Sequence, residues 1–527
     1  MVWVDRAVGE IRRRFAEEIA KGKPLVIRDE KTLSGRVHVG SLRGIAIHGL
    51  IGQVLRAQNI SCIFKFELND FDPMDAIPAT LDHTQYEKYM GQPLYTVPSP
   101  REGHENYPMV FGDELKGVVE PLGFPIEWYT LRPHYQQGDF NDVIHLALDH
   151  AAEIRAIYKE VSGSMKPDDW YPLQVICEKC GKVGTTQVTQ WNGKTVIYEC
   201  KKNLVQWAEG CNHRGEISPF DGHAKLPWKV EWPAKWKVFG VTIEGAGKDH
   251  SAAGGSRDIG KRIVEEIFHY PEPYNIPYEF FNVRGKKMSA SKGIGASSKE
   301  IADLLPPKLL KLLMIRKAPN QPIDFDPEGT TIPLLFDGYD QLADHYFKRH
   351  PNPDTDSART FHLTQIDFPT PPRNIWHMRF SLLSFIVQMP HLQLLEEAEH
   401  VKSAKLTVDE IQDLQERTFY VKQWLKKFAP QEYRYAILAK SPMGFSVDVE
   451  TRRALEEAKK ALSSVEWKGE AIHAALHEVK RQTGIAPKNF FSALYQAFLG
   501  RQSGPQMGWF LSTFSREQVI GRIEAIT

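Results

Sequence analysis

The stretch Thr32-Leu33-Ser34-Gly35-Arg36-Val37-His38-Val39-Gly40-Ser41 decides the fold of this 527-residue chain. It follows the apolar segment 24–28 and precedes residues 42–55, in which apolar side chains recur on one helical stripe. A second apolar segment comes next, at residues 62–68. A strand, a turn of small residues and a helix is the arrangement that holds phosphate at a helix N-terminus in an open parallel sheet. The sequence therefore predicts a Rossmann-like α/β nucleotide-binding domain.

The turn itself offers groups that suit a phosphate. Glycine at positions 35 and 40 lets the backbone approach a ligand closely. His38 can donate a hydrogen bond to a phosphate oxygen, and Ser41 is expected to cap the helix that follows. The alternative is a strand-end turn with a packed histidine. The position of the turn, between a strand and an amphipathic helix, favours phosphate binding.

A basic segment far downstream complements this turn: Lys286-Lys287-Met288-Ser289-Ala290-Ser291-Lys292-Gly293. Lysine ammonium groups on a flexible loop can close over a triphosphate and neutralise charge that develops on the leaving pyrophosphate. The alternative is an ordinary exposed basic loop. Together the two segments predict an ATP clamp, with His38 and Ser41 on one side and Lys287 and Lys292 on the other.

A third segment, Gly247-Lys248-Asp249-His250, lies between the first two. Glycine ahead of an acid and an imidazole suits recognition of a ribose and a base. Asp249 could accept hydrogen bonds from sugar hydroxyls, and His250 could line a pocket for an amino acid. The alternative is a polar turn.

Composition limits the possible partners. The chain has 66 basic and 66 acidic residues, so it is not a generic binder of polyanions, and a nucleic acid would need a local basic face. The runs 422–427 and 480–482 could supply that face or could be solvated helix surfaces. No apolar run approaches the ~18 residues of a membrane span, and the first residues lack the apolar core of a signal peptide. We expect a cytoplasmic protein with no membrane partner.

Four of the five cysteines cluster in a short stretch of the chain. Cys177 and Cys180 form a Cys-x-x-Cys pair, and Cys200 and Cys211 follow at a looser spacing. Four thiolates around a tetrahedral ion are typical of a structural Zn²⁺ site. His213 could replace Cys211 as the fourth ligand, and a degenerate site or a redox pair is an alternative to zinc.

The pattern of apolar residues divides the chain along its length. Residues 1–300 are expected to form the catalytic domain, with an insertion at 71–225 that includes a small β-rich zinc module at 170–222. Residues 301–350 are expected to connect this domain to an all-helical domain at 351–527, where long amphipathic stretches dominate.

The three segments resemble the signature sequences of class I aminoacyl-tRNA synthetases. His38–Ser41 is similar to the "HIGH" element, Lys287–Ser291 to the "KMSKS" loop, and Gly247–His250 to the segment between them. The combination of these segments with Asn69-Asp70-Phe71-Asp72 is most similar to the lysyl branch of the class. The resemblance extends over essentially the whole chain, including a helical C-terminus like the anticodon-binding domain of that branch.

The resemblance implies a substrate set and a division of roles. It implies ATP with Mg²⁺, L-lysine and tRNA(Lys) as substrates and cofactors, a lysyl-adenylate intermediate, and a monomer. Catalytic roles fall on His38, Ser41, Lys287 and Lys292. ATP-binding roles fall on Thr32, Ser34, Gly35, His38, Gly40, Gly247, Asp249, Lys287, Met288, Ser289, Ser291 and Lys292. Lysine-binding roles fall on Asp70, Asp72, Trp228, His250 and Tyr278, with Asp70 and Asp72 at the end of a strand, where open sheets bind ligands.

Some features leave other functions open. Ala290 stands where the full family pattern has a second lysine, and Lys292 could replace that charge. Asp70 and Asp72 could instead be helix-cap or turn residues. A glutamyl-type synthetase would need a buried arginine, against which the two acids argue. A small-metabolite nucleotidyltransferase would leave the helical C-terminus unexplained, and a non-catalytic tRNA-binding paralogue would leave the three signature segments unexplained.

Overall fold

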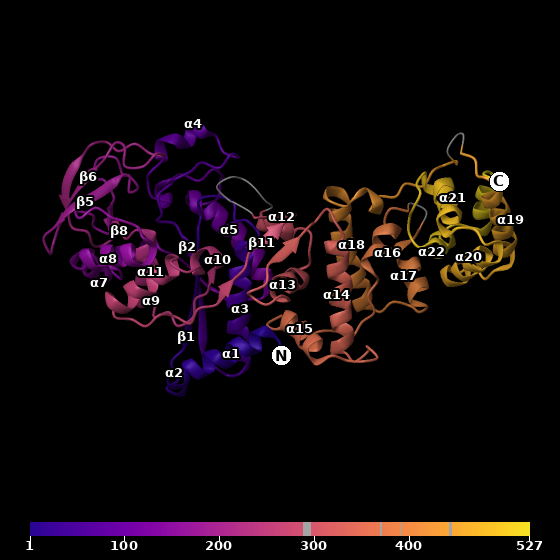
Figure 1. The fold of residues 1–527 in the computed structure, drawn as a ribbon, viewed down its shortest axis with the longest axis horizontal. Helices are drawn as coiled ribbons and strands as arrows, with labels where there is room; N and C mark the ends of the chain where they lie inside the picture. The colour runs from indigo at the N-terminus through magenta and orange to yellow at the C-terminus, as the bar shows by residue number, and fades with distance from the viewer. Residues whose placement is uncertain (288–296, 369–370, 390–391, 442–444) are drawn as a thin grey trace. The chain divides into compact units, whose positions relative to one another are not determined.

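The computed structural model divides the chain into two compact units, drawn in Figure 1. Unit 1 comprises residues 1–325 and 341–372, and unit 2 comprises residues 326–340 and 373–527. The structure describes residues 1–287, 297–368, 371–389, 392–441 and 445–527.

A parallel sheet forms the centre of unit 1, as the sequence predicted. Strands β1 (Leu25–Thr32), β2 (Cys62–Asn69) and β3 (Glu127–Thr130) lie in the order β1-β2-β3. Leu25 pairs with Cys62 and Lys65 pairs with Glu127, both in parallel. Ile243 continues the sheet beyond β1 through a parallel bridge to Ile27, and Tyr274 follows through a bridge to Ile243. The carboxyl ends of these strands therefore share one edge.

Helix α3 (Ser41–Ala57) makes the crossover from β1 to β2 and is buried along almost its whole length. It packs between α1 (Trp3–Arg14) and α13 (Pro307–Ile315). Gly49 lets α3 approach Phe124 closely, because a Cβ atom at position 49 would lie 2.5 Å from the Phe124 ring. A helix that is buried on all sides, as α3 is, occupies a core position, and its polar residues Arg43, His48 and Gln53 are buried with it.

Helix α9 (Trp228–Val238) is equally buried, although its sequence is rich in charge. Trp236 is fully buried and belongs to the large core cluster that α9 shares with α8 (Ala151–Ser162) and α11 (Ser256–Glu266). The helix also buries Glu231 and Lys235 completely. Charged side chains are almost never fully buried unless they are paired, so α9 must meet charged partners.

Two small sheets occupy the part of unit 1 that carries the cysteines. Strands β5 (Thr186–Trp191), β6 (Val196–Cys200) and β7 (Arg214–Ile217) form an antiparallel sheet in that order. Strand β4 (Gln174–Val175) pairs in antiparallel fashion with β8 (Ala224–Lys225). All of these strands except β8 fall within residues 170–222, where the sequence indicated a β-rich module, and β8 lies just beyond it.

The remaining elements of unit 1 are short. Its other helices are α2 (Ala16–Ala20), α4 (His83–Tyr86), α5 (Tyr107–Val119), α6 (Arg132–Gln136), α7 (Asn141–Asp149), α10 (Lys248–Ser251), α12 (Ser298–Ala302) and α15 (Thr355–Gln365). Its other strands are β9 (Ala246–Gly247), β10 (Pro277–Tyr278), β11 (Phe281–Val283), β12 (Lys286–Lys287) and β13 (Ile323–Phe325). Short 3-10 helices occur at Glu87–Tyr89, Leu94–Thr96, Glu120–Leu122 and, in unit 2, Gln431–Tyr433.

The regular secondary structure of unit 2 is helical in the residues that the structure describes, as expected. Arg417 lies at its centre and binds the carboxylate of Asp340 at 2.5 Å and that of Asp413 at 2.9 Å. No described helix of the chain is both long and apolar enough to span a membrane. The helices of unit 2 are α14 (Thr331–Tyr346), which continues into unit 1, α16 (Phe380–Ile386), α17 (Leu394–Lys402), α18 (Val408–Lys427), α19 (Val449–Ser464), α20 (Gly469–Thr483), α21 (Pro487–Leu499), α22 (Met507–Ser512) and α23 (Arg516–Glu524).

Lys311, on α13, is another buried basic residue of unit 1. Its ammonium donates to Gln53 Oε1 at 2.9 Å and lies 4.8 Å from the ring centre of Phe124. Burial lowers the pKa of Lys311 to about 7, against a partial opposing effect of Asp367. Between this pKa and the ordinary pKa of lysine, the Lys311 side chain is therefore mostly neutral in the folded protein and protonated in the unfolded chain.

Lys311→Met should change how stability depends on pH. Because the pKa of Lys311 is lowered on folding, its unfavourable contribution is complete below pH 7 and disappears as the pH rises towards 10. We expect the variant to gain about 1–4 kcal/mol in free energy of unfolding at pH 7 and little at pH 10. Urea denaturation at several pH values measures both. Lys159→Met, at an exposed position on α8, should behave like wild type, and equal pH slopes in wild type and Lys311→Met would refute the assignment.

Candidate functional site

The backbone of the His38 turn lies beside residues 297–298, which follow the downstream basic segment in the sequence. His38 forms an antiparallel bridge with Ser297, and the Ser298 N–H donates to the Val37 carbonyl at 2.8 Å. At the start of that segment, Lys287 lies in β12, which pairs with β11. Met288, Ser289, Ser291 and Lys292 lie outside the described residues, as does Ala290.

His38 has the properties of a neutral hydrogen-bonding group. Its Nδ1 atom is buried and has no hydrogen-bond partner in the part of the chain that the structure describes. Burial, with help from the nearby Lys31 ammonium, lowers the pKa of His38 to about 4. The imidazole is therefore uncharged at neutral pH. A buried ring nitrogen without a partner is unusual enough to indicate a ligand that is absent here.

The expected cap at Ser41 does not form. Helix α3 begins at Ser41, so Gly40 is its N-cap residue, and no side chain caps the helix. Gly40 has helical backbone angles, with φ −60° and ψ −28°, whereas a capping side chain needs an extended residue. The prediction that Ser41 caps α3 was therefore wrong. The first N–H groups of α3 instead donate to backbone carbonyls of the turn, Ser41 to His38, Leu42 to Val39 and Arg43 to Gly40, at 3.0–3.1 Å.

The segment at 247–250 supplies an aromatic group to the same edge of the sheet. Gly247 pairs with Tyr278 through the parallel strands β9 and β10. The Trp228 ring lies 5.1 Å from that of His250, centre to centre, and is stacked on that of Trp232 at 5.7 Å. Three of the residues proposed for an amino acid, Trp228, His250 and Tyr278, therefore come from elements that meet in this part of unit 1.

Asp70 is occupied by backbone groups. Its Oδ1 atom accepts from the N–H groups of Leu131 and Arg132, both at 3.0 Å, at the start of α6. Burial raises the pKa of Asp70 to about 6, although these backbone hydrogen bonds oppose the rise. Asp70 therefore caps the start of α6, which is the helix-cap role that the sequence left open for it.

Asp72 has a different environment, at the edge of a cluster of charges. Its Oδ2 atom accepts from the Thr32 hydroxyl at 2.6 Å, and its Oδ1 atom is ion-paired with the Lys225 ammonium. Burial alone would raise the pKa of Asp72, but Lys225 and Lys235 hold it below its ordinary value. Asp72 is therefore an ionised carboxylate at the carboxyl end of the sheet.

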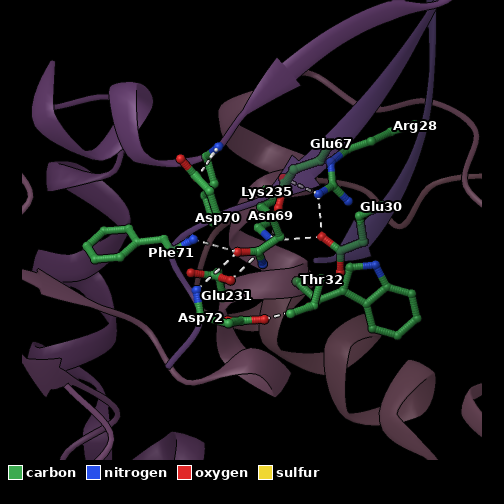
Figure 2. A network of polar contacts seen from close by, with 12 residues as sticks. Arg28, Glu30, Thr32, Glu67, Asn69, Asp70, Phe71, Asp72, Glu231 and Lys235 are labelled. Atoms are coloured by element: carbon green, nitrogen blue, oxygen red, sulfur yellow. Dashed lines mark hydrogen bonds and ion pairs between the residues drawn. The ribbon is translucent and has the colours of Figure 1, made fainter. Parts of the chain in front are cut away.

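A network of buried ion pairs joins β1, β2 and α9 beneath this edge (Figure 2). The Lys235 ammonium lies 2.7 Å from Glu30, 2.7 Å from Glu67 and 3.1 Å from Glu231. The Arg28 guanidinium lies 2.6 Å from Glu30 and 2.5 Å from Glu67. Lys235 and Arg28 therefore hold together side chains that would otherwise repel one another.

The network contains more acids than bases. Five carboxylates surround three cations among the described residues, and burial raises the pKa of Glu67 and of Glu244, which relieves part of the excess. Glu30 and Asp72 are its most accessible acids, each with 17% of the side chain exposed. The site therefore favours a further cation at that exposed edge. The carboxylates are Glu30, Glu67, Asp72, Glu231 and Glu244, and the cations are Arg28, Lys225 and Lys235.

Asp29 is an acid at this edge that the sequence analysis missed. Gly245 donates its N–H to His48 Nε2 at 2.7 Å, so the proton of a neutral His48 lies on Nδ1 and is donated to Asp29 Oδ2 at 3.0 Å. A Cβ atom at Gly44 would lie 2.8 Å from Asp29 Oδ2 and 2.7 Å from the Tyr278 hydroxyl. Asp29 and Tyr278 are thus neighbours over α3. The available signal was the acid pair 29–30 at the end of the first strand.

The four clustered cysteines meet in space. The Sγ atoms of Cys177, Cys180, Cys200 and Cys211 all lie within 4.8 Å of one another. Cys177 and Cys211 are 3.6 Å apart, and Cys180 and Cys200 are 3.7 Å apart. His213 is not a member of the group. Four thiols this close can surround one metal ion without the histidine.

Comparison with known proteins finds similarity to tRNA synthetases over almost the whole chain. A family model described as tRNA synthetases class I (K) matches residues 1–367, and one described as an anticodon binding domain matches residues 383–527. A lysine--tRNA ligase of Archaeoglobus fulgidus is 32% identical over 100% of both chains. A lysine--tRNA ligase of Thermoplasma volcanium is 30% identical over 100% of this chain and 99% of that one.

Replacing Lys235 should expose the repulsion within the network. In Lys235→Met, Glu30, Glu67 and Glu231 lose their shared cation while staying buried, which should cost about 3–5 kcal/mol in free energy of unfolding at pH 7. Urea denaturation measures the loss. Lys237→Met, on the same helix but with no ion pair among the described residues, should change stability by less than about 0.5 kcal/mol. Similar effects in the two variants would show that the network does not hold the sheet to α9.

Proposed function

This chain belongs to the class I (K) tRNA synthetase family, and we propose that it attaches L-lysine to tRNA(Lys) with ATP. The observation that carries the proposal is similarity over the full length of the chain to curated lysine--tRNA ligases. The excess of carboxylates at the edge of the sheet supports it, because a substrate with an ammonium side chain completes the charge balance.

The reaction has two steps that need no covalent enzyme intermediate. The lysine carboxylate attacks the α-phosphorus of ATP, pyrophosphate leaves, and a terminal hydroxyl of the tRNA then attacks the lysyl-adenylate. Catalysis of this kind consists of positioning and electrostatic stabilisation. Mg²⁺ supplies positive charge to the phosphates when it is bound.

We assign the phosphates to the turn after β1. The buried, unpartnered Nδ1 of His38 supports this assignment. Ser41 then serves through its place in the first turn of α3 rather than as a cap. Lys287 and Lys292 are proposed to act on the pyrophosphate from the opposite side. The remaining ATP contacts are proposed for Thr32, Ser34, Gly35, Gly40, Gly247, Asp249, Met288, Ser289 and Ser291.

We assign the lysine side chain to Asp72, with Glu30 and Asp29 nearby, and with walls formed by Trp228, His250 and Tyr278. The partly exposed, ionised carboxylate of Asp72 supports this assignment. The hydrogen bonds of Asp70 to α6 favour a supporting role for that residue. A glutamyl enzyme would need a buried arginine in the pocket, whereas the cations beside Asp72, Lys225 and Lys235, are each surrounded by carboxylates.

We further propose that the four cysteines hold a structural Zn²⁺ and that the enzyme is a monomer. A closed set of four thiolates leaves no open position for catalysis. The ion would instead tie strand β6, which ends at Cys200, to the Cys-x-x-Cys turn at 177–180.

A charging assay tests the proposed function. The full chain should attach lysine, and not glutamate, to tRNA when all twenty amino acids are tried separately with ATP and Mg²⁺. The tRNA must be present, since adenylate formation in this branch is expected to depend on it. Glutamate attachment would replace the proposal with a glutamyl enzyme, and the absence of any charging would favour a non-catalytic paralogue.

Asp72→Asn should mainly weaken lysine binding. Loss of one charge-assisted hydrogen bond predicts a KM for lysine about 10- to 100-fold higher, with a smaller effect on the KM for ATP. Asp70→Asn should change the KM for lysine less than Asp72→Asn does, and Asp142→Asn, at an exposed position on α7, should not change it. An unchanged KM for lysine in Asp72→Asn, with normal unfolding in urea, would contradict the assignment.

The metal proposal predicts one Zn²⁺ per chain by elemental analysis of the purified protein. Cys180→Ser should lose that metal and lower the melting temperature, because three ligands hold zinc less firmly than four. Cys62→Ser is the matched control, since Cys62 lies outside the cluster, and it should keep the metal. Metal-free wild type that melts at the same temperature with and without added zinc would rule out a structural ion.

A further inference from the structure

Lys31 is a cation beside the proposed phosphate site that the proposed chemistry leaves without a role. It lies next to the last residue of β1, at the carboxyl edge of the sheet. Side chains alternate between the two faces of a strand, so Lys31 shares the face of Asp29 and not that of Glu30. Asp29 contacts His48 on α3. The Lys31 side chain therefore leaves the sheet on the side of α3 and the turn that precedes it.

The Lys31 ammonium has no hydrogen-bond or ion-pair partner among the residues that the structure describes, although the side chain is partly buried. Burial lowers the pKa of Lys31, while Asp29 and Glu30 oppose that fall. An unpartnered cation away from water is unfavourable unless a ligand completes its environment. The more deeply buried lysines of unit 1 all have protein partners: Lys225 has Asp72, Lys235 has Glu67 at 2.7 Å, and Lys311 has Gln53 at 2.9 Å.

The other basic groups of the turn and of the start of α3 are already engaged or neutral. Arg36 binds Glu114 at 3.0 Å, and Arg43 donates to two backbone carbonyls at 2.9 Å. His38 is uncharged at neutral pH, because burial and the nearby Lys31 charge lower its pKa to about 4. A triphosphate carries several negative charges, which a neutral imidazole cannot balance. Among the described residues of this turn and helix start, Lys31 is therefore the cation that remains available for a phosphate.

The downstream basic segment has one lysine fewer than the full class pattern, since Ala290 stands at the position of the second. A cation on β1 differs from one on that segment, because it is fixed to a central strand of the sheet. Such a fixed charge suits the α-phosphate, which must keep its position while pyrophosphate leaves.

We propose that the Lys31 ammonium binds a non-bridging oxygen of the α-phosphate of ATP and stabilises the charge that develops there during adenylate formation. A carboxylate oxygen of lysine forms a bond to the α-phosphorus, the bond from that phosphorus to the bridging oxygen breaks, and pyrophosphate leaves with the electron pair. Lys31 keeps its proton throughout. Preorganised charge at the reacting centre is usually the largest single contribution to catalysis. The inference rests on the proposed function for the reaction, but the contact with the nucleotide can be tested by itself.

Charging kinetics of Lys31→Met test the proposal. The kcat/KM for ATP should fall about 10²- to 10³-fold, since removing one stabilising group from a reacting centre has an effect of this size, whereas the KM for lysine should change less. Lys31→Arg keeps the positive charge and should recover part of the loss. Lys65→Met is the matched control and should behave like wild type, because Lys65 lies on the neighbouring strand β2 but is paired with Glu127 at 2.6 Å.

ATP in which sulfur replaces one α-phosphate oxygen identifies the contact. The two diastereomers of this analogue differ in which non-bridging oxygen is replaced, so wild type should use one of them better than the other. Lys31→Met should lose most of that preference, since the charged contact that distinguishes the two oxygens is gone, and Lys65→Met should keep it. An unchanged preference in Lys31→Met would overturn the assignment to the α-phosphate.

Stability separates this role from a structural one. A partly buried ammonium without a partner is unfavourable in the unliganded protein, so the urea midpoint of Lys31→Met without ATP should equal or exceed that of wild type. An ammonium that serves only to balance the charge of Asp29 predicts a lower midpoint. A lower midpoint together with an unchanged kcat/KM for ATP would overturn the proposal.

Direct binding separates the failure of this inference from that of the proposed function. Calorimetric titration with ATP and Mg²⁺ needs neither tRNA nor lysine, and Lys31→Met should bind ATP about 10- to 100-fold more weakly than wild type, because one charged interaction is lost. Lysine charging by wild type, with equal ATP binding and ATP kinetics in the two proteins, would refute only this inference. Weaker ATP binding by Lys31→Met, with no lysine charging by wild type, would refute only the proposed function.

Discussion

The ammonium of Lys235, shared by Glu30, Glu67 and Glu231, is the interaction on which the carboxyl end of the sheet depends. Two of these acids come from adjacent parallel strands in register, Glu30 opposite Glu67. Without a cation between them, two ionised carboxylates in the interior would repel each other strongly. Because Lys235 comes from α9, the same contact that relieves this repulsion also fixes α9 against β1 and β2. The aromatic residues that begin α9 are thereby held near the strand ends.

The acids of β1 are divided between the two faces of the sheet, so that one contacts α9 and the other contacts α3. Arg28, Glu30 and Thr32 alternate with Asp29 and Lys31 along the strand, so successive side chains point to opposite faces of the sheet. One set meets the network on α9, and the other meets His48 on α3 and the His38 turn. Strand β1 therefore presents a carboxylate on each face of the sheet, Glu30 on one and Asp29 on the other, near the proposed substrate site.

Local sequence was enough to predict the elements that depend on local periodicity and spacing. The strand, turn and helix from residue 24 to residue 57 follow from apolar patterning, and the meeting of four cysteines follows from their clustering. The buried cations could not be predicted in this way. Lys225 and Lys235 look like surface lysines, because only the acids brought to them by distant strands make their burial possible. Asp72 was found from its place after a strand, while Asp70, two residues earlier, is used by α6. The cap at Ser41 was mispredicted because capping depends on backbone angles that a residue pattern does not contain.

The contact among Gly44, Asp29 and Tyr278 limits what position 44 can accept. A Cβ atom there would lie 2.8 Å from Asp29 Oδ2 and 2.7 Å from the Tyr278 hydroxyl. Because His48 also holds the Asp29 carboxylate through Nδ1, a larger residue at 44 would have to displace Asp29 or Tyr278. Glycine at this point of α3 therefore lets an acid of the strand and an aromatic side chain share one place, so that a substitution in a buried helix would be felt as a change of charge and shape at the edge of the sheet.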